Sequence, residues 1–351
     1  MDIGDRMILS QKSPHITLQQ VAQHAGVSRA TASLVVRGSR SISEATRNKV
    51  YDSIRELGYV YDRGAASLRS RSSSTVGLII MELANSFYSE LLVGVHHELD
   101  KFGQTVFLGT TFDSYDVQER LISTMLEHRV GGIILSAVPG SQPATIRRIQ
   151  LLGIPVVLVG RQVSDTQCDY VGIDNVAGGK LATNHLLQLG HRRIAFLGGL
   201  SQMSSWQGRK QGYTAAFQDA GLEADPSLIR ESRATLQCGV DLVQQIMHEP
   251  NPPTAIFCYN DIFAIGAMMK LKEMGIVPGQ DIAIVGFDDI TEASILSPKL
   301  TTVSSCIRAM GKYAATLLHE RIEGLTDDPR TIILEPQLII RESCSTNSRT
   351  H

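Results

Sequence analysis

Polar and aromatic side chains follow directly after several apolar runs of this 351-residue sequence, and their types suit the binding of a sugar. A sugar ring packs its flat apolar face on an aromatic ring, and its adjacent hydroxyl groups pair with carboxylates, amides and guanidinium groups. The set that we expect to hold such a ligand is Phe87, Tyr88, Arg161, Ser205, Trp206, Arg209, Asn260 and Asp288, with Asn85 and Asp261 beside them.

The apolar runs that precede these residues predict the strands of parallel sheets. They are "TVGLIIM", "QTVFLGT", "VGGIILSA", "IPVVLVG", "RRIAFLGG", "TAIFCYN" and "DIAIVGF", separated by amphipathic stretches. Near-continuous Val, Ile and Leu runs are typical of parallel strands that helices cover on both faces. Ligands of such sheets bind outside the carboxyl ends of the strands, which is where the candidate residues stand.

Two α/β lobes are the simplest arrangement of these strands. The stretch "DYVGIDN", residues 169–175, predicts a crossing between the lobes, and "LTTVSS", residues 300–305, predicts a return. We therefore expect a core over residues 75–345. Its first lobe would contain about 75–173 and 304–330, and its second lobe about 174–303 and 331–345.

Two of the candidate side chains have a second interpretation. Trp206, the only tryptophan, either stacks on a ligand or packs over the edge of the cleft. Arg161 either meets a phosphate or an acidic sugar, or forms a surface ion pair with Asp165. Asp174 is interpreted as structural, because it stands where it can cap the helix that "AGGKLATNHLL" predicts.

Residues 16–38, "ITLQQVAQHAGVSRATASLVVRG", predict two short helices joined by a tight turn. Thr17 with Gln20 fits a capping box at the start of the first helix. Gly26 can adopt the left-handed conformation of the turn, and Ser28 is a good N-cap for the second helix.

The second of these helices turns a small and polar face outward. Ala32, Val35 and Val36 can pack inward. The side chains left for the outer face are Arg29, Ala30, Thr31, Ser33 and Leu34. Such a face suits the major groove of DNA, where Arg reads guanine, Ser and Thr reach bases or phosphates, and small apolar groups contact a thymine methyl. A helix-turn-helix is therefore favoured over a plain three-helix packing unit.

A third helix follows from Ser43, with Val50, Ile54 and Leu57 as its apolar stripe and Gly58 as its end. The next residues, 59–74, are basic and then serine-rich, as in a linker. Within them, one helical turn around Ala65 and Leu68 can order on contact with DNA or with a second copy of the chain, and a disordered tether is the alternative.

Charge is distributed unevenly along the chain. The first 75 residues hold 11 Lys and Arg against 6 Asp and Glu, whereas the remaining residues hold 22 against 29. A basic segment on an acidic body is suited to a phosphate backbone, because basic side chains displace condensed counterions. On charge alone, a solvated charged surface is an equally good explanation.

Several ordered motifs resemble those of the LacI/GalR family of bacterial transcription regulators. The first is "ITLQQVAQHAGVSRATASLVVRGSRSISEATRNKVYDSIRELGYVYDRGAASLRS". The others are "VGIDNVAGGKLATNHLLQLGHRRIAFLGG", "YNDIFAIGAM", "DIAIVGFDD" and "LTTV". The resemblance covers nearly the whole chain. It implies an α/β protein with a helix-turn-helix head at 15–61, a hinge helix and linker at 62–74, and a two-lobed periplasmic-binding-protein-like type I core.

The resemblance also assigns roles to residues. Arg29, Ala30 and Thr31 would face bases, Ser28 and Ser33 would lie at phosphates, and Leu68 would be a wedge that enters the minor groove. The full DNA-binding set expected is Thr17, Ser28, Arg29, Ala30, Thr31, Ser33, Leu34, Arg37, Arg63, Ala65 and Leu68. Leu34 departs from the Arg of many relatives, so a known operator half-site does not transfer directly.

Other classes of protein fit the sequence less well. An extracytoplasmic sugar receptor would explain the core, but it would leave the head unexplained, and the start "MDIGDRMILSQKSPH" lacks the features of a signal peptide. An enzyme is disfavoured by the lack of GxSxG, P-loop and GxGxxG motifs and of clustered His and Cys ligands. The five widely spaced cysteines suggest neither disulfides nor zinc. We expect a cytoplasmic protein with no cofactor, no metal and no membrane segment.

The expected mechanism is thermodynamic linkage in a homodimer. Two heads would bind a pseudo-palindromic operator in double-stranded DNA, and a sugar or sugar phosphate between the lobes would change the affinity for that operator. The resemblance favours a repressor of carbohydrate-utilisation genes that its effector releases. The segment "CSTNSRTH" is too short for a heptad-bearing tetramerisation helix, so a dimer is expected.

Overall fold

The computed structural model describes residues 16–36, 38, 39, 41–60 and 73–344. The chain divides into two compact units, Met1–Arg71 and Ser72–His351, which we call the head and the core. Within the described residues, no helix combines the length and the apolar character needed to cross a membrane.

The head contains three helices, α1 (Leu18–His24), α2 (Arg29–Val36) and α3 (Glu44–Leu57). Its small core consists of fully buried apolar side chains from all three helices: Val21, Ala22, Ala32, Val35 and Val50. Val36, expected to pack inward, is only half-buried. The predicted helix boundaries are confirmed, because Gly26 and Gly58 both adopt left-handed φ angles, of 66° and 65°.

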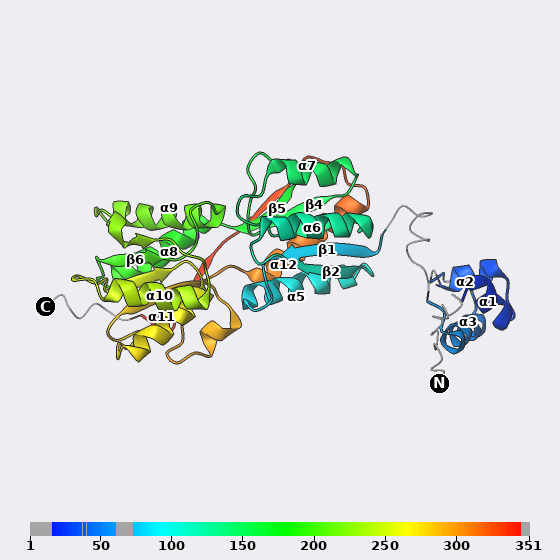
Figure 1. Ribbon diagram of the computed structural model, residues 1–351, viewed down its shortest axis with the longest axis horizontal. Helices are drawn as coiled ribbons and strands as arrows, with labels where there is room; N and C mark the ends of the chain where they lie inside the picture. The colour runs from blue at the N-terminus through cyan, green and yellow to red at the C-terminus, as the bar shows by residue number, and fades with distance from the viewer. Residues whose placement is uncertain (1–15, 37, 40, 61–72, 345–351) are drawn as a thin grey trace, which may run out of the picture. The chain divides into compact units, whose positions relative to one another are not determined.

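The first lobe of the core is a six-stranded parallel sheet with the strand order β11-β5-β4-β3-β1-β2 (Figure 1). The strands are β1 (Thr75–Ile80), β2 (Thr105–Thr110), β3 (Ile133–Leu135), β4 (Val156–Val159), β5 (Asp169–Ile173) and β11 (Thr331–Leu334). One face packs on α5 (Ser86–Asp100) and α12 (Ile307–Ile322), and the other packs on α6 (Tyr115–Glu127) and α7 (Pro143–Leu151). The apolar runs are thus strands covered on both faces, as predicted.

The second lobe repeats this plan with the strand order β12-β10-β9-β8-β6-β7. The strands are β6 (Ile194–Leu197), β7 (Ile229–Arg230), β8 (Ala255–Cys258), β9 (Ala283–Asp288), β10 (Thr301–Ser304) and β12 (Gln337–Ile339), and β12 alone among them runs antiparallel to its neighbour. The helices α8 (Asn175–Gln188) and α9 (Ser204–Asp219) cover one face, and α10 (Leu236–Met247) and α11 (Asp261–Glu273) cover the other. Short 3-10 helices occur at Pro226–Leu228 and Thr291–Ser294.

The chain passes between the two lobes three times. It leaves the first sheet after β5, returns from β10 to α12, and leaves again between β11 and β12. The expected boundary at residue 331 is corrected by this arrangement. Residues Thr331–Leu334 pair in parallel with β5 and therefore belong to the first lobe, so the last crossing follows Leu334. The run "TIIL" gave no signal of its partner, because a short edge strand is equally compatible with either sheet.

Candidate functional site

The head presents the amino-terminal end of α2 to solvent. Ser28, Arg29 and Ala30 are exposed, Thr31 and Ser33 are half-buried, and Leu34 is 39% exposed. The expected outward face is therefore outward in the structure. The free backbone N–H groups at a helix start carry partial positive charge, which together with Arg29 suits a polyanion.

Two capping side chains position these helices. The Ser28 Oγ accepts a hydrogen bond of 3.0 Å from the Thr31 backbone N–H and shares a hydrogen bond of 2.9 Å with the Thr31 Oγ1. Thr17 forms the predicted capping box with Gln20 at the start of α1. The other DNA-binding candidates, Arg37, Arg63, Ala65 and Leu68, lie outside the described residues.

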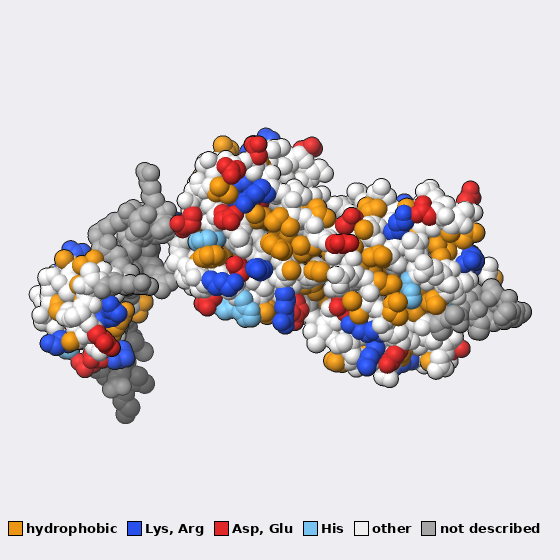
Figure 2. Space-filling view, turned by 180° about the vertical axis from the view of Figure 1, so that it is seen from behind, with side chains coloured by type: hydrophobic (Ala, Val, Ile, Leu, Met, Phe, Trp, Pro, Cys, Tyr) orange, Lys and Arg blue, Asp and Glu red, His pale blue; other side chains and the backbone are white. Residues whose placement is uncertain are grey.

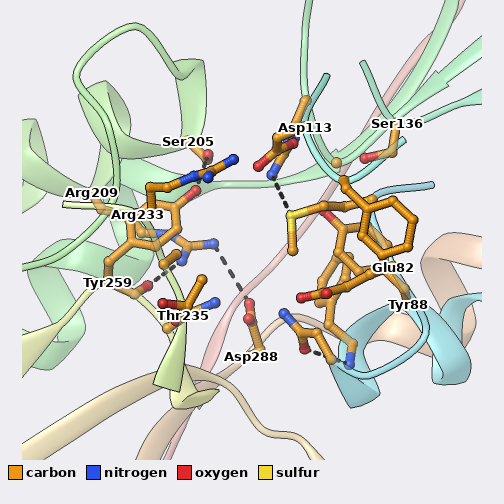
Figure 3. Close-up of a pocket in the computed structure, with 18 residues that line it drawn as sticks. Glu82, Tyr88, Asp113, Ser136, Ser205, Arg209, Arg233, Thr235, Tyr259 and Asp288 are labelled. Atoms are coloured by element: carbon orange, nitrogen blue, oxygen red, sulfur yellow. Dashed lines mark hydrogen bonds and ion pairs between the residues drawn. The ribbon is translucent and has the colours of Figure 1, made fainter. Parts of the chain in front are cut away.

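A cavity of about 270 Å³ lies between the two lobes of the core (Figure 3). The first lobe lines it with Met81, Glu82, Asn85, Phe87, Tyr88, Phe112, Asp113, Ser136, Gly160 and Arg161. The second lobe lines it with Ser205, Arg209, Arg233, Ala234, Thr235, Tyr259, Asn260 and Asp288. Most of these residues follow the carboxyl end of a strand, as expected for parallel sheets. Seven of the eight ligand candidates are brought together here.

Arg209 is held rigidly in the wall of this pocket. Its Nε donates to the Asn175 Oδ1 at 3.0 Å, and its Nη1 donates to the Tyr259 carbonyl oxygen. Its guanidinium carbon lies 3.5 Å from the centroid of the Phe287 ring. The backbone is fixed as well, since a Cβ on Gly179 of α8 would overlap the Arg209 carbonyl oxygen in α9. The guanidinium is therefore preorganised to face the cavity.

Asp288 lies opposite Arg209, with 3.6 Å between the Asp288 Oδ1 and the Arg209 Nη2. Burial raises the pKa of Asp288 to about 6, while Arg209 and the hydrogen bond from Ser305 lower it. The Ser305 Oγ donates to the Asp288 Oδ1 at 3.1 Å. Ser305 directly follows β10, so this carboxylate touches both the pocket and a crossing between the lobes.

The first-lobe wall contains a second ion pair, which is partly buried. The Arg161 Nη1 donates to the Asp113 Oδ1 at 2.6 Å and to the Ala137 carbonyl oxygen at 3.2 Å. The surface pair with Asp165, one of the two interpretations considered, is therefore wrong. Asp113 takes that place because the turn after β2 brings it beside the end of β4.

Aromatic rings line both sides of the cavity. Phe87 and Tyr88 meet edge to face, with their centroids 5.0 Å apart. Burial raises the pKa of Tyr88 to about 12, so its hydroxyl stays protonated. On the second lobe, the Ser205 Oγ and the Tyr259 hydroxyl lie 2.7 Å apart in a hydrogen bond. These rings and hydroxyl groups match the faces and edges of a sugar.

Trp206 does not line the pocket, which decides between its two interpretations. It is 5% exposed, packs against Phe196, and donates from its Nε1 to the Gly198 carbonyl oxygen at 3.1 Å. Its helix turns Ser205 and Arg209 toward the cavity and Trp206 away from it. We therefore remove Trp206 from the ligand-binding candidates.

Several residues that line the pocket were not predicted from the sequence. Phe112 and Asp113 follow "QTVFLGT", and Ser136 comes directly after the strand residues of "VGGIILSA", so the rule that found the other candidates could have found these three. Arg233 and Thr235 follow β7, a strand of only two residues, and no apolar run marked their position. Within the described part of the chain, no group of three or more His, Cys, Asp or Glu side chains is placed to hold a metal ion.

Two family models match successive parts of the chain. Residues 17–62 match the bacterial regulatory proteins of the lacI family, and residues 73–342 match the periplasmic binding proteins and sugar binding domain of the LacI family. The chain belongs to the LacI family. The matched ranges correspond to the head and to the two-lobed core.

Individual relatives of this LacI-family chain match most of its length. It is 36% identical to the HTH-type transcriptional regulator CelR of Thermobifida fusca, over 93% of this chain and 98% of that protein. The solved CelR–cellobiose complex has a TM-score of 0.72 at 35% identity, covering 93% of this chain and 99% of that one. A lac repressor dimer bound to operator and the anti-inducer ONPF has a TM-score of 0.81 at 26% identity, covering 94% and 99%.

This LacI-family protein is accordingly a DNA-binding transcription regulator and not an enzyme. The alternative of a sugar receptor without DNA function is not favoured, because the matched head belongs to regulatory proteins.

Proposed function

We propose that this protein is a homodimeric cytoplasmic repressor of carbohydrate-utilisation genes, released from its operator by a sugar bound between the lobes. The observation that supports a sugar as the effector is the arrangement of Arg209, Asn260 and Asp288 opposite the aromatic pair Phe87 and Tyr88. Planar hydrogen-bonding groups and aromatic faces in one cavity are complementary to a pyranose or furanose ring. CelR, a relative of similar length, has been solved with cellobiose.

For the head, we assign base contacts to Arg29, Ala30 and Thr31 and phosphate contacts to Ser33. The exposure of Arg29 and Ala30 at the start of α2, with Thr31 and Ser33 half-buried beside them, supports this assignment. Ser28 would act mainly through its cap, because its hydroxyl oxygen already accepts from the Thr31 N–H.

The proposal that the protein forms a homodimer is supported by apolar side chains on the surface of the core. Large apolar side chains that are exposed there include Leu83, Met269 and Ile295. Figure 2 shows apolar side chains gathered in patches on both lobes of one face. Patches of this kind are commonly covered in oligomers, and a two-fold dimer would match a pseudo-palindromic operator.

The route from ligand to DNA would run through the crossings between the lobes. Asp288 lines the pocket and accepts from Ser305, which leads directly into α12 of the first lobe. A ligand that binds both lobes selects one angle between them and so biases the spacing of the two heads.

The test is fluorescence anisotropy with labelled pseudo-palindromic fragments from upstream of the protein's own gene, at two salt concentrations. We expect salt-sensitive binding that cellobiose, maltose or another sugar of a panel abolishes. Arg209→Lys should bind the same fragment but require on the order of 100 times more sugar for release, because an ammonium cannot replace the planar guanidinium.

The matched control is Lys210→Arg, on the next residue of α9 but outside the pocket lining, which should be released like wild type. Binding that a sugar strengthens would contradict the inducible repressor. A sugar that binds the core with no effect on DNA affinity would contradict the linkage.

A further inference from the structure

Arg161 brings a positive charge into the first-lobe wall. Without a partner, this charge would attract the phosphate group of a ligand. Its side chain is 14% exposed, and the side chain of its partner Asp113 is 20% exposed. The Nη1 is engaged by the Asp113 Oδ1 at 2.6 Å and by the Ala137 carbonyl oxygen, while the Nη2 lies 3.9 Å from the Met81 Sδ. The guanidinium is thus already satisfied on its Nη1 before any ligand arrives.

The positive and negative side chains that line the pocket are equal in number. Three arginines, Arg161, Arg209 and Arg233, stand against three carboxylates, Glu82, Asp113 and Asp288. Two of the arginines are in ion pairs with two of the carboxylates. A phosphate dianion entering this cavity would meet no net positive charge, and it would compete with carboxylates already held at short range.

The backbone holds Asp113 in this position. Phe112 and Asp113 have φ angles of 50° and 56°, a left-handed conformation that costs free energy in residues other than glycine. Hydrogen bonds on both sides of the turn maintain it. The Phe112 N–H donates to the Met81 carbonyl oxygen at 2.9 Å, and the Ser114 N–H donates to the Thr111 carbonyl oxygen at 2.9 Å. Strain of this kind is retained where the surrounding structure fixes a functional side chain.

We propose that Asp113 determines specificity: by neutralising Arg161 it makes the pocket select neutral sugars and reject their phosphate esters. This proposal rests on the proposed function, and it narrows the effector from sugars and sugar phosphates to neutral sugars. It also gives Arg161 the role of a hydrogen-bond donor to hydroxyl groups and not of a phosphate ligand.

The test measures the affinity of the full-length protein by isothermal titration calorimetry for matched pairs of probes. The pairs are glucose with glucose 6-phosphate and cellobiose with its 6-phosphate ester. Wild type should bind the neutral member of a pair at least about tenfold more tightly. Asp113→Asn removes the charge but keeps the side-chain shape, and Asn tolerates the left-handed backbone. This variant should gain about tenfold in affinity for the phosphate ester, with a gain that salt weakens.

Two further variants make the result specific. Asp165→Asn removes the same charge from another residue with a left-handed φ, 57°, on the exposed surface of the first lobe and outside the pocket lining. It should leave both affinities unchanged. The double variant Asp113→Asn with Arg161→Gln should lose the gained affinity for the phosphate ester, because the freed cation has been removed.

Tighter binding of the phosphate ester by wild type would overturn the proposal, and this comparison needs no variant to fold. Equal gains in Asp113→Asn and Asp165→Asn would also overturn it, because they would reflect net charge alone. The proposed function fails differently: wild type would then bind neither member of any pair.

Discussion

The Ser86 Oγ, at the start of α5 in the first lobe, donates a hydrogen bond of 2.5 Å to the Glu292 Oε1 in the second lobe. On another side of the junction, the Gln162 N–H donates to the Ser204 Oγ at 3.2 Å. These bonds join the lobes without passing through the crossing strands, and they stabilise the angle between the lobes at which the pocket is enclosed.

Ser86→Ala should therefore lower effector affinity about three- to tenfold, because one polar contact that favours the enclosed arrangement is lost. Ser89→Ala is the matched control, since the Ser89 Oγ donates only to the Ser86 carbonyl oxygen of its own helix. Calorimetry with the sugar that wild type binds checks both. Equal losses in the two variants would show that the contact with Glu292 contributes nothing to the enclosed arrangement.

The pH dependence of binding should follow Asp288, whose pKa burial raises to about 6 from the ordinary value of 3.8. The ionised carboxylate is the better acceptor for sugar hydroxyl groups, so effector affinity should be constant above about pH 7 and fall as the pH drops through 6. In Asp288→Asn this fall should be absent. A profile that keeps its shape in the variant would assign the titration to another group.

Stability should respond to the same group with the opposite sign. A raised pKa in the folded state means that folding favours the proton, so this contribution grows as the pH falls through 6 and is lost as the pH rises through 6. The unfolding free energy of wild type relative to Asp288→Asn should rise by about 1–2 kcal/mol between about pH 7.5 and about pH 5. Urea unfolding at both pH values measures it.

Asp169 should be the most costly carboxylate to replace in the first lobe. Its side chain is fully buried, and it accepts from the Arg321 Nε at 2.9 Å, the Arg321 Nη2 at 2.7 Å and the Arg330 N–H at 2.8 Å. Burial acts to raise its pKa, but Arg321 and Arg330 together lower it below the ordinary value. Asp169→Asn should lower the unfolding free energy by about 3 kcal/mol, because a largely buried guanidinium loses its counter-charge.

Glu320→Gln provides the control, because Glu320 pairs with Arg330 at the surface and its loss should cost less than about 1 kcal/mol. A lowered pKa stabilises the fold above the unfolded pKa, so the difference between wild type and Asp169→Asn should persist at neutral pH and shrink in acid below about pH 4. A difference that grows in acid would contradict this assignment.

Replacing Arg29 in the head should change the affinity for operator DNA and not the stability of the fold. It is exposed at the first position of α2, so Arg29→Ala should weaken operator binding by about 1–3 kcal/mol while leaving the melting of the head unchanged. Ser28→Ala should instead lower the stability of the head by about 1 kcal/mol, because it removes the cap of the Thr31 N–H. Circular dichroism and anisotropy on the same samples separate the two effects.

Local signals in the sequence were sufficient for the head and for most strands. Thr17, Gly26, Ser43 and Gly58 act through bonds and backbone angles within a few residues of themselves, so their types alone locate the helix ends. The buried runs such as "IPVVLVG" likewise require no knowledge of their partners to be recognised as strands.

Contacts between segments that are far apart in the sequence could not be predicted from the sequence. The pair of Arg161 with Asp113 joins residues 48 positions apart, and nothing in either neighbourhood distinguishes Asp113 from Asp165 as the partner. Trp206 and Arg209 lie in one helix, and only the packing of α9 on α8 decides which of them faces the cavity. The place of β11 in the first sheet depends similarly on a pairing with β5 across some 160 residues.

The threefold passage of the chain between its lobes also sets an order for folding during synthesis. The three helices of the head lie between Leu18 and Leu57, so all of them have been made before the first strand of the core begins. The first lobe, although it begins at Thr75, lacks one of the two helices on one face and the strand at one edge until α12 and β11 have been made. Its sheet is completed only at Leu334 of the 351 residues, so the DNA-reading unit exists long before the unit that controls it.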